Sequence, residues 1–274
     1  MTKAKKTTTT TNPDWWGTYD FADGDCRGWH IGPLRLIARR EATDWVLAHA
    51  SEEDPLASTL EIDQPCESVT DDTLQQARFA FQTEQTQLDI SLRLADRPFS
   101  VRPEHPVSVP SGQAVTIYIT TPIWLHLCVG AKRIFLTEIA TYRPSDSWFG
   151  NTRSGELCYA TRTRAKSRMA DLPHPPHRAT TPVRVINKAT ETLRIEQLKL
   201  PMPNLALYRD ANGSLLTQSV EFTRNSAGAS ATMRLSHAPA KAERISEPRL
   251  RLRDNRVLQV FDWVLGQNSN FVAV

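Results

Sequence analysis

Apolar and polar residues alternate along most of this chain, and no other feature of the sequence limits the possible folds as strongly. Between Val115 and Thr120, three aliphatic residues take turns with two threonines and a tyrosine. Alternation with period two is typical of half-buried β-strands, in which successive side chains point to opposite faces of a sheet. The same pattern predicts further strands at residues 29–38, 45–48, 78–81, 88–94, 123–129, 134–139, 157–164, 183–187, 193–200, 205–208, 219–223 and 231–235.

The residues between these stretches favour sheets over helical bundles. The chain has 18 prolines and 11 glycines, and many flank the predicted strands, as is common at the edges of sandwiches. The dipeptide Asn212-Gly213 predicts a hairpin with a type I′ turn. One helix is expected at residues 254–265, where apolar residues recur at helical spacing between the N-cap Asp254 and the terminator Gly266. We therefore predict an all-β fold of two packed β-sandwich-like units with a short C-terminal helix.

The charge of the chain changes sign near its middle. Residues 13–140 hold 10 basic and 19 acidic side chains, whereas residues 141–274 hold 20 basic and 11 acidic ones. We predict a disordered tail at residues 1–12, an acidic β unit at 13–141, a basic β unit with the terminal helix at 142–266, and a second tail at 267–274. Such polarity would hold the units together, drive self-association or offer a basic face to an anionic partner.

The sequence predicts a cytoplasmic protein without a transmembrane helix. The longest apolar run, residues 123–130, is interrupted by His126 and falls short of the ~20 residues that cross a bilayer. The first residues carry lysines and threonines but lack the apolar region of a secretory signal. The four cysteines lie far apart and form no CxxC pair, which favours reduced thiols over disulfides.

Residues 142–168 hold the densest group of chemically capable side chains. If residues 156–168 form one strand, the basic residues at even positions share a face and make a cationic ladder. Counterions and water, the acidic N-terminal half or an anionic ligand would have to offset its charge. We predict that this segment binds a protein or another anionic partner, with Asp146 and Glu156 as internal partners. The expected binding residues are Arg143, Asp146, Trp148, Arg153, Glu156, Tyr159, Arg162, Arg164, Lys166, Arg168, His177 and Arg178.

Two sharper interpretations compete with simple binding. A hydrolase or transferase would be centred on Asp146, Glu156, Cys158 and Arg162, with Cys158 as the nucleophile and His174 or His177 as its base. A metal site would use the two histidines of His174-Pro-Pro-His177, with His105, His126 or Cys158 as further ligands. A cysteine beside apolar residues is more often a small buried hydrophobe, and prolines on both sides make His-Pro-Pro-His a stiff connection. We therefore expect no catalytic residues, metal or cofactor, although the sequence leaves enzymatic activity open.

Other motifs favour structural roles. His126 is expected to be a hydrogen-bonded histidine of the core, and Trp148-Phe149 a hydrophobic plug at a seam. The alternating run Arg249-Leu-Arg-Leu-Arg253 is typical of an edge strand whose charges discourage pairing with other chains. Zinc-finger spacing, helix-turn-helix patterns and glycine-rich phosphate loops do not occur, so nucleic acid is not an expected partner.

Several motifs together resemble an uncharacterised prokaryotic family, domain of unknown function number 432, over residues 15–265. They are Trp16-Gly-Thr-Tyr19, Trp29-His-Ile-Gly-Pro-Leu-Arg35, Tyr142-Arg-Pro-Ser-Asp-Ser-Trp-Phe-Gly150, Gly155-Glu-Leu-Cys-Tyr-Ala-Thr-Arg162, Pro176-His-Arg-Ala-Thr-Thr-Pro-Val183 and Leu198-Lys-Leu-Pro-Met-Pro203. The resemblance carries no assigned activity. It implies a role beside mechanosensitive channels, so we expect a non-enzymatic binding or assembly module with a protein partner, self-association or a membrane-protein complex.

Overall fold

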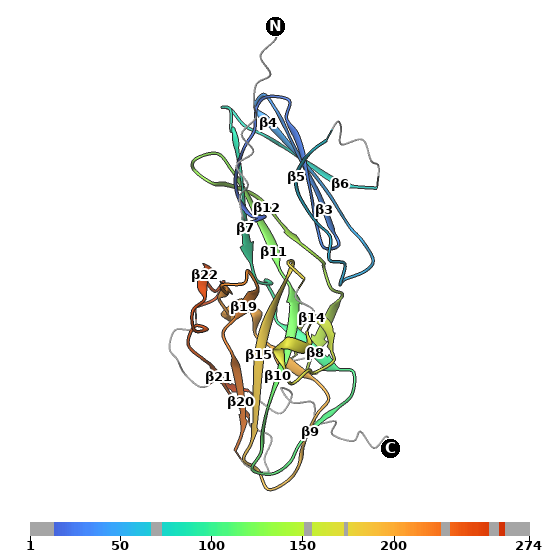
Figure 1. Cartoon of the computed structure of the whole chain (residues 1–274), viewed down its shortest axis with the longest axis vertical. Coiled ribbons are helices and arrows are strands. Elements are labelled where there is room, and N and C mark those ends of the chain that lie inside the picture. Colours follow the sequence, from blue (N-terminus) through green and yellow to red (C-terminus); the bar gives the residue numbers. More distant parts are fainter. Residues whose placement is uncertain are drawn as a thin grey trace.

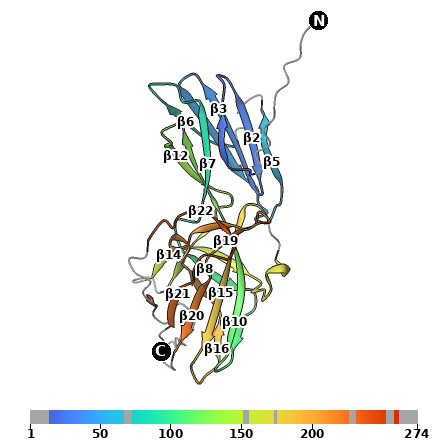
Figure 2. The same cartoon turned by 60° about the vertical axis from the view of Figure 1, so that its left-hand side comes forward.

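The protein is all-β, as the alternating pattern predicts. The structure is a computed structural model that describes residues 14–66, 73–150, 155–172, 175–225, 231–251 and 258–260. Its strands form several sheets that include a curled half-barrel, and the helical structure within the described residues is limited to two short 3₁₀ turns, η1 (Met169–Asp171) and η2 (Met202–Asn204). The molecule is elongated, with one group of strands above another in Figure 1 and in the turned view of Figure 2.

Two sheets form the upper part. Sheet I has four strands in the order β1 (Gly17–Asp20), β7 (Gln87–Arg93), β11 (Trp124–Val129) and β12 (Ile134–Ala140). Sheet II has five, in the order β5 (Leu60–Pro65), β2 (Cys26–Ile31), β3 (Leu34–Glu41), β4 (Asp44–Ser51) and β6 (Gln75–Ala80).

Aromatic side chains fill the space between these two sheets. The rings of Tyr19 and Trp29 lie 5.2 Å apart, and those of Phe21 and Trp45 lie 4.8 Å apart, in both cases edge to face. All four side chains are buried, and such pairs stabilise a fold beyond the area they bury. This aromatic layer continues into the core of the lower part, so the buried residues form one main cluster.

The lower part contains the remaining sheets. Sheet III has the order β13 (Asp146–Phe149), β14 (Glu156–Thr163), β8 (Phe99–Pro103) and β17 (Leu198–Leu200). Sheet IV has the path β22 (Glu243–Ser246), β18 (Leu207–Arg209), β19 (Leu215–Thr217), β15 (Arg178–Asn187), β20 (Val220–Arg224), β21 (Ala231–Leu235) and β23 (Leu258–Val260), with β10 (Ala114–Pro122) also paired to β15. A separate pair joins β9 (Val107–Val109) to β16 (Leu193–Ile195).

Strands from both sides of residue 141 share sheets. The strand β8 pairs with β14 and β17, β9 pairs with β16, and β10 pairs along its whole length with β15. Two units divided at residue 141 would therefore have to exchange strands with each other. The division at that residue stays a prediction.

Four local predictions from the sequence are wrong. Residues 193–200, expected as one strand, form β16 and β17, which belong to different sheets. Residues 258–260, inside the expected C-terminal helix, form β23 and pair with β21, because the apolar residues there extend a sheet; the rest of that segment lies outside the described residues. Residues 29–38 form two strands, since Gly32 makes a turn with φ of +58°. The hairpin at Gly213 exists, but Asn212 lacks the positive φ that a type I′ turn requires.

The cysteine prediction is also wrong for one pair. Cys26 and Cys66 form a disulfide, with their Cα atoms 5.2 Å apart. The register of β2 and β5 explains it, because Arg27 lies opposite Pro65 and the next residues outward are the two cysteines. Cys128 and Cys158 are free and buried. The cytoplasmic location was predicted partly from reduced cysteines. Without that support, it stays a prediction.

Polar contacts link the upper and lower parts. The buried imidazole of His177 in the lower part lies 3.1 Å from the carbonyl oxygen of Pro55 through its Nε2 atom. A Cβ atom on Gly32 would overlap this ring. On another side, the Arg249 guanidinium donates to Glu138 on β12 at 2.7 Å and to the Leu94 carbonyl at 2.8 Å. Arg249 is thus a cross-link and does not lie on the edge strand predicted for residues 249–253, of which 252 and 253 lie outside the described residues.

Candidate functional site

The cationic ladder predicted on residues 156–168 does not form. Strand β14 ends at Thr163, and Ala165 has a positive φ of 47° that turns the chain away. Beyond that end, Arg164 pairs with Glu104 at 3.2 Å, and Lys166 forms a backbone bridge with Tyr118 on β10. Arg168 precedes the turn η1. Of the four basic residues, Arg162 is therefore the one that β14 presents.

Most of the other predicted binding residues in this segment contact one another or nearby charges. Asp146 accepts hydrogen bonds from both Arg97 and Arg143 at 3.2 Å. The same two guanidinium groups lie over the ring of Tyr159, at 5.4 and 5.7 Å from its centre, where the aromatic face attracts cations. The Tyr159 hydroxyl donates to Asp96 at 2.9 Å. This network offsets its own charges and leaves little for a ligand.

Glu156 and Cys158 also have partners within the fold. Glu156 pairs with Lys199 on β17. The Cys158 thiol is fully buried, and its Sγ lies 3.4 Å from the carbonyl oxygen of Glu156. Burial, together with the charge of Glu156, raises the pKa of Cys158 to about 11 despite the opposing charge of Lys199. At neutral pH the thiol is therefore protonated, and the thiolate needed for nucleophilic attack is scarce.

The remaining predicted residues are dispersed. Trp148 is 43% exposed beside Leu157 across the β13–β14 pair, whereas Phe149 is buried, so half of the expected aromatic plug points outward. His126 is hydrogen-bonded as expected, to Glu138 at 2.9 Å. Arg153 and His174 lie outside the described residues.

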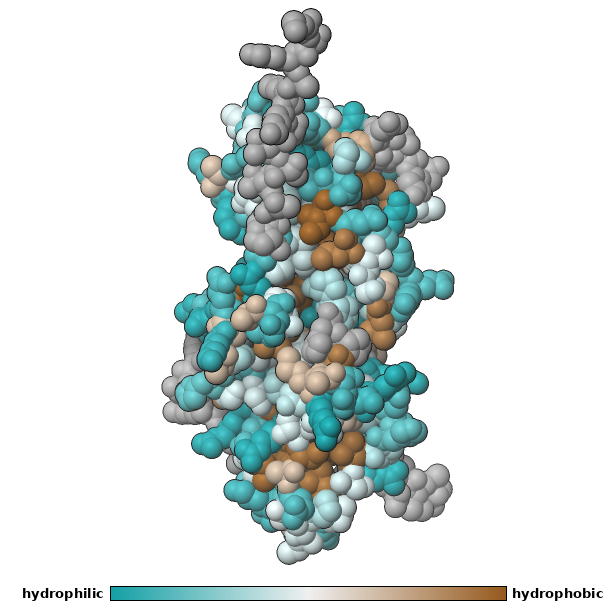
Figure 3. Space-filling view, viewed as in Figure 1, coloured by the Kyte–Doolittle hydropathy of each residue, from teal (hydrophilic) through white to brown (hydrophobic). Residues whose placement is uncertain are grey.

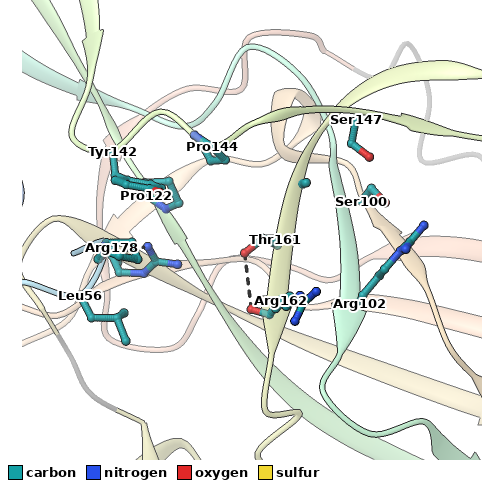
Figure 4. Close-up of a pocket in the computed structure, with 12 residues that line it drawn as sticks. Leu56, Ser100, Arg102, Pro122, Tyr142, Pro144, Ser147, Thr161, Arg162 and Arg178 are labelled. Atoms are coloured by element: carbon teal, nitrogen blue, oxygen red, sulfur yellow. Dashed lines mark hydrogen bonds between the residues drawn. The ribbon is translucent and has the colours of Figure 1, made fainter. Parts of the chain in front are cut away.

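A hollow of about 560 Å³ opens where the two parts of the molecule meet (Figure 4). Strand β14 crosses it, with Arg178 and Leu56 on one side and Arg102 and Ser100 on the other. Its lining comes from the β4–β5 connection, from β8, β13, β14 and β15, and from the segments around residues 122 and 142–144; the residues are Pro55, Leu56, Ser100, Arg102, Pro122, Tyr142, Pro144, Ser147, Ala160, Thr161, Arg162 and Arg178. Three of these are arginines and none is acidic.

The arginines Arg102 and Arg162 are held side by side by the sheet. Strands β8 and β14 run parallel, and Arg102 and Arg162 are directly paired in their register. Both side chains are exposed. Like charges facing each other on neighbouring strands repel and destabilise a sheet. An anion between the two guanidinium groups would remove this repulsion.

The third arginine, Arg178, is buried at 9% exposure. It donates hydrogen bonds to the carbonyl oxygen of Thr120 at 2.7 Å, to the Thr120 hydroxyl at 3.4 Å and to the carbonyl oxygen of Pro55 at 3.5 Å. These acceptors are neutral, so the charge has no carboxylate beside it among the residues that line the hollow. Burial lowers the pKa of Arg178 to about 10, with the opposing influence of Tyr142 smaller. The guanidinium is still cationic at neutral pH.

The sequence identified two of the three arginines in this hollow. Arg162 and Arg178 are both among the predicted binding residues, but Arg102 was missed. Its signal is faint, because Arg102 stands alone among apolar neighbours on a short strand. Its place beside Arg162 follows only from the parallel pairing of β8 with β14, which joins residues about sixty positions apart.

Figure 3 shows polar surface over most of one face, with apolar patches scattered on it. In the described ranges, His, Cys, Asp and Glu side chains nowhere gather in threes that could hold a metal ion. Across those same ranges there is no helix long and apolar enough to span a membrane.

Comparison with known proteins gives one match. No curated protein and no solved structure is similar to this chain. A family model does match, over residues 15–265, and its description is "Protein of unknown function (DUF432)". The resemblance seen in the motifs is thereby confirmed, and the chain belongs to the DUF432 family.

Proposed function

We propose that this protein is a non-enzymatic binding module that docks an anionic partner in the arginine hollow, defined by Arg102, Arg162 and Arg178. The observation that carries this proposal is the lining of the hollow, in which three guanidinium groups face no acidic residue. Several other arginines of the lower part have acidic partners, as Arg164 has in Glu104 and Arg184 has in Glu221. The hollow is thus a place where positive charge is left for another molecule.

The position of the hollow suits a docking role. We propose that the sheets act as two sandwich-like units, with the hollow at their junction, where Pro55 and Leu56 of the upper part meet Arg178 of the lower part. A group bound there touches both units, so its binding energy also holds them in one arrangement. A protein partner, a membrane-protein complex of the kind that the family resemblance implies, or a second copy of this chain would each supply such a group.

The alternative is a hydrolase or transferase centred on Asp146, Glu156, Cys158 and Arg162. The arrangement supports it less well, because each carboxylate is paired with a cation and the Cys158 thiol has a raised pKa. Rapid alkylation of Cys158 by iodoacetamide in the folded protein at neutral pH would favour the enzyme; labelling that appears only on unfolding supports the binding module.

The docking proposal is tested by affinity purification from the native host. The variant Arg102→Glu/Arg162→Glu reverses two charges in the hollow, while Arg234→Glu on β21 reverses an exposed charge that does not line it. We expect proteins that co-purify with the wild type to be lost with the double variant and kept with the control. Light scattering on the same samples reports self-association. An identical set of partners and the same mass for all three, with circular dichroism showing them folded, would refute the proposal.

A further inference from the structure

We propose that the anionic group held in the arginine hollow is a phosphoryl group, carried by an ester whose organic part lies against the apolar wall of the same hollow. This inference rests on the proposed function and narrows its ligand. It assigns the phosphoryl group to Arg102 and Arg162, which are paired across β8 and β14, with Arg178 supplying charge from the opposite wall.

The charge of the lining favours a phosphate over a carboxylate. Among the described residues that line the hollow, three arginines and no acid give a formal charge of three. A phosphate monoester carries about −1.5 to −2 at neutral pH, whereas a carboxylate carries a single charge and would leave more repulsion between Arg102 and Arg162. Guanidinium groups also match the oxygens of a phosphate in two-pronged hydrogen bonds.

The hydroxyl groups of the lining add donors for the remaining oxygens. Ser147, Thr161 and Tyr142 all border the hollow. Thr161 adjoins Arg162 on β14, and in Figure 4 it lies between that residue and Arg178. The Thr161 hydroxyl donates to the Arg162 carbonyl oxygen at 3.5 Å, a long hydrogen bond that it can exchange for one to a ligand oxygen. The hollow therefore has hydroxyl donors in addition to its arginines.

The size and the apolar wall of the hollow indicate more than a bare ion. About 560 Å³ lies within the ~300–1,000 Å³ that small-molecule sites usually occupy, well above the needs of one phosphate. Pro55, Leu56, Pro122 and Pro144 also line the hollow, and in Figure 4 Leu56, Pro122 and Pro144 lie on the same side of β14 as Arg178. Rigid apolar surfaces of this kind suit a planar or hydrocarbon group attached to the phosphate.

The shape of the charged surface disfavours an extended polyanion. A nucleic acid strand needs a track of cations along several phosphates. Here β14 ends at Thr163, and the next basic residue, Arg164, is paired with Glu104. Arg102, Arg162 and Arg178 gather around one hollow instead of following a track, which matches a compact anion.

Calorimetric titration of the full chain with inorganic phosphate, phenyl phosphate and benzoate tests the ligand class. We expect phenyl phosphate to bind about tenfold or more tightly than benzoate, because its second charge strengthens the contacts with the arginines; a tenfold difference corresponds to about 1.4 kcal/mol for these contacts together. The variant Arg102→Gln/Arg162→Gln should weaken phenyl phosphate about a hundredfold, and the control Arg234→Gln should leave it unchanged. Arg178→Lys keeps a cation at the opposite wall and should retain part of the affinity.

Vesicles distinguish the two sources of such a group. If the ester is a lipid headgroup, the protein should sediment with phosphatidylcholine vesicles that contain phosphatidic acid and not with pure phosphatidylcholine; if it is a soluble ester, it should bind phenyl phosphate and neither vesicle. Equal affinity for phenyl phosphate and benzoate, or equal affinity of wild type and double Gln variant, overturns the phosphoryl assignment. Loss of co-purifying proteins on charge reversal would, in that case, leave the docking function standing.

Discussion

The burial of His177 leads to a specific dependence of stability on pH. The side chain is fully buried, and its burial lowers the pKa to about 4 from the ordinary value of 6.5, although the hydrogen bond to Pro55 opposes the shift. The folded protein therefore keeps this imidazole neutral in a pH range where the unfolded chain protonates it. Because the unfolded state then binds more protons, the free energy of unfolding falls as the pH falls from about 6.5 towards 4.

The size of this effect follows from the two pKa values. Linkage gives a loss of about 2 kcal/mol between pH 7 and pH 5, and about 3 kcal/mol between pH 7 and pH 4. A His177→Gln variant keeps an amide that can donate to the Pro55 carbonyl but has no proton to gain. Its free energy of unfolding should therefore vary less with pH, so that the difference between wild type and variant changes by these amounts.

Urea denaturation at pH 7, 6 and 5, followed by tryptophan fluorescence, measures this difference. The matched control is His49→Gln, since the pKa of His49 is also lowered by burial but the residue lies outside the Pro55 contact. It should remove its own part of the pH dependence and leave that of His177 intact. A constant difference between wild type and His177→Gln from pH 7 to pH 5 would show that this imidazole does not carry the buried, neutral form that the structure gives it.

Three further outcomes are expected. Gly32→Ala should lower the free energy of unfolding by more than the about 1–2 kcal/mol that a left-handed backbone alone costs, because its Cβ overlaps His177. Gly213→Ala, with open space around it, should lose only the backbone part. Equal losses of unfolding free energy in the two variants would contradict this. Arg249→Met should cost about 1.5–3 kcal/mol at neutral pH, the usual value of hydrogen bonds to a charged group. Burial raises the pKa of Glu138, but the hydrogen bonds and charges of Arg249 and His126 outweigh burial and hold it below 4.5. This cost should therefore persist above about pH 4.5 and shrink as the pH falls further, leaving the part due to the hydrogen bond with the Leu94 carbonyl. Thiol titration in denaturant without reductant should find two free thiols per chain, those of Cys128 and Cys158; four would refute the disulfide.

Much of the strand content could be read from alternation alone. The predicted strands at residues 88–94, 134–139 and 231–235 correspond to β7, β12 and β21 within a residue or so at each end. Their residues alternate because one face of each strand is buried, and burial on one face is a local property of the pattern. The helix expected at residues 254–265 was wrong because a short apolar stretch suits either a helix or a strand, and pairing with β21 decides between them.

The site was harder to predict, because its charges are balanced or left unbalanced by residues far away in the sequence. Arg164 was expected to bind a partner, yet Glu104 neutralises it from a segment 60 residues away. Asp146 was expected to pair within the segment, yet Arg97, 49 residues away, also neutralises it. Arg102 looked isolated, yet the parallel pairing places it beside Arg162. The sequence shows the charge of each residue but not which residues become its neighbours in the fold.

Alternating hydrophobicity made a β fold unavoidable for this chain, and the family motifs along residues 15–265 placed it among proteins of the same kind. Both are local patterns, which can be read from the sequence without knowing which residues are in contact. Tertiary structure alone chose the disulfide between Cys26 and Cys66, the burial of His177 and Arg178, and the gathering of three arginines around one hollow. Each of these depends on which strands become neighbours, and strand pairing between distant segments is set by the packing of the whole core rather than by any one stretch of residues.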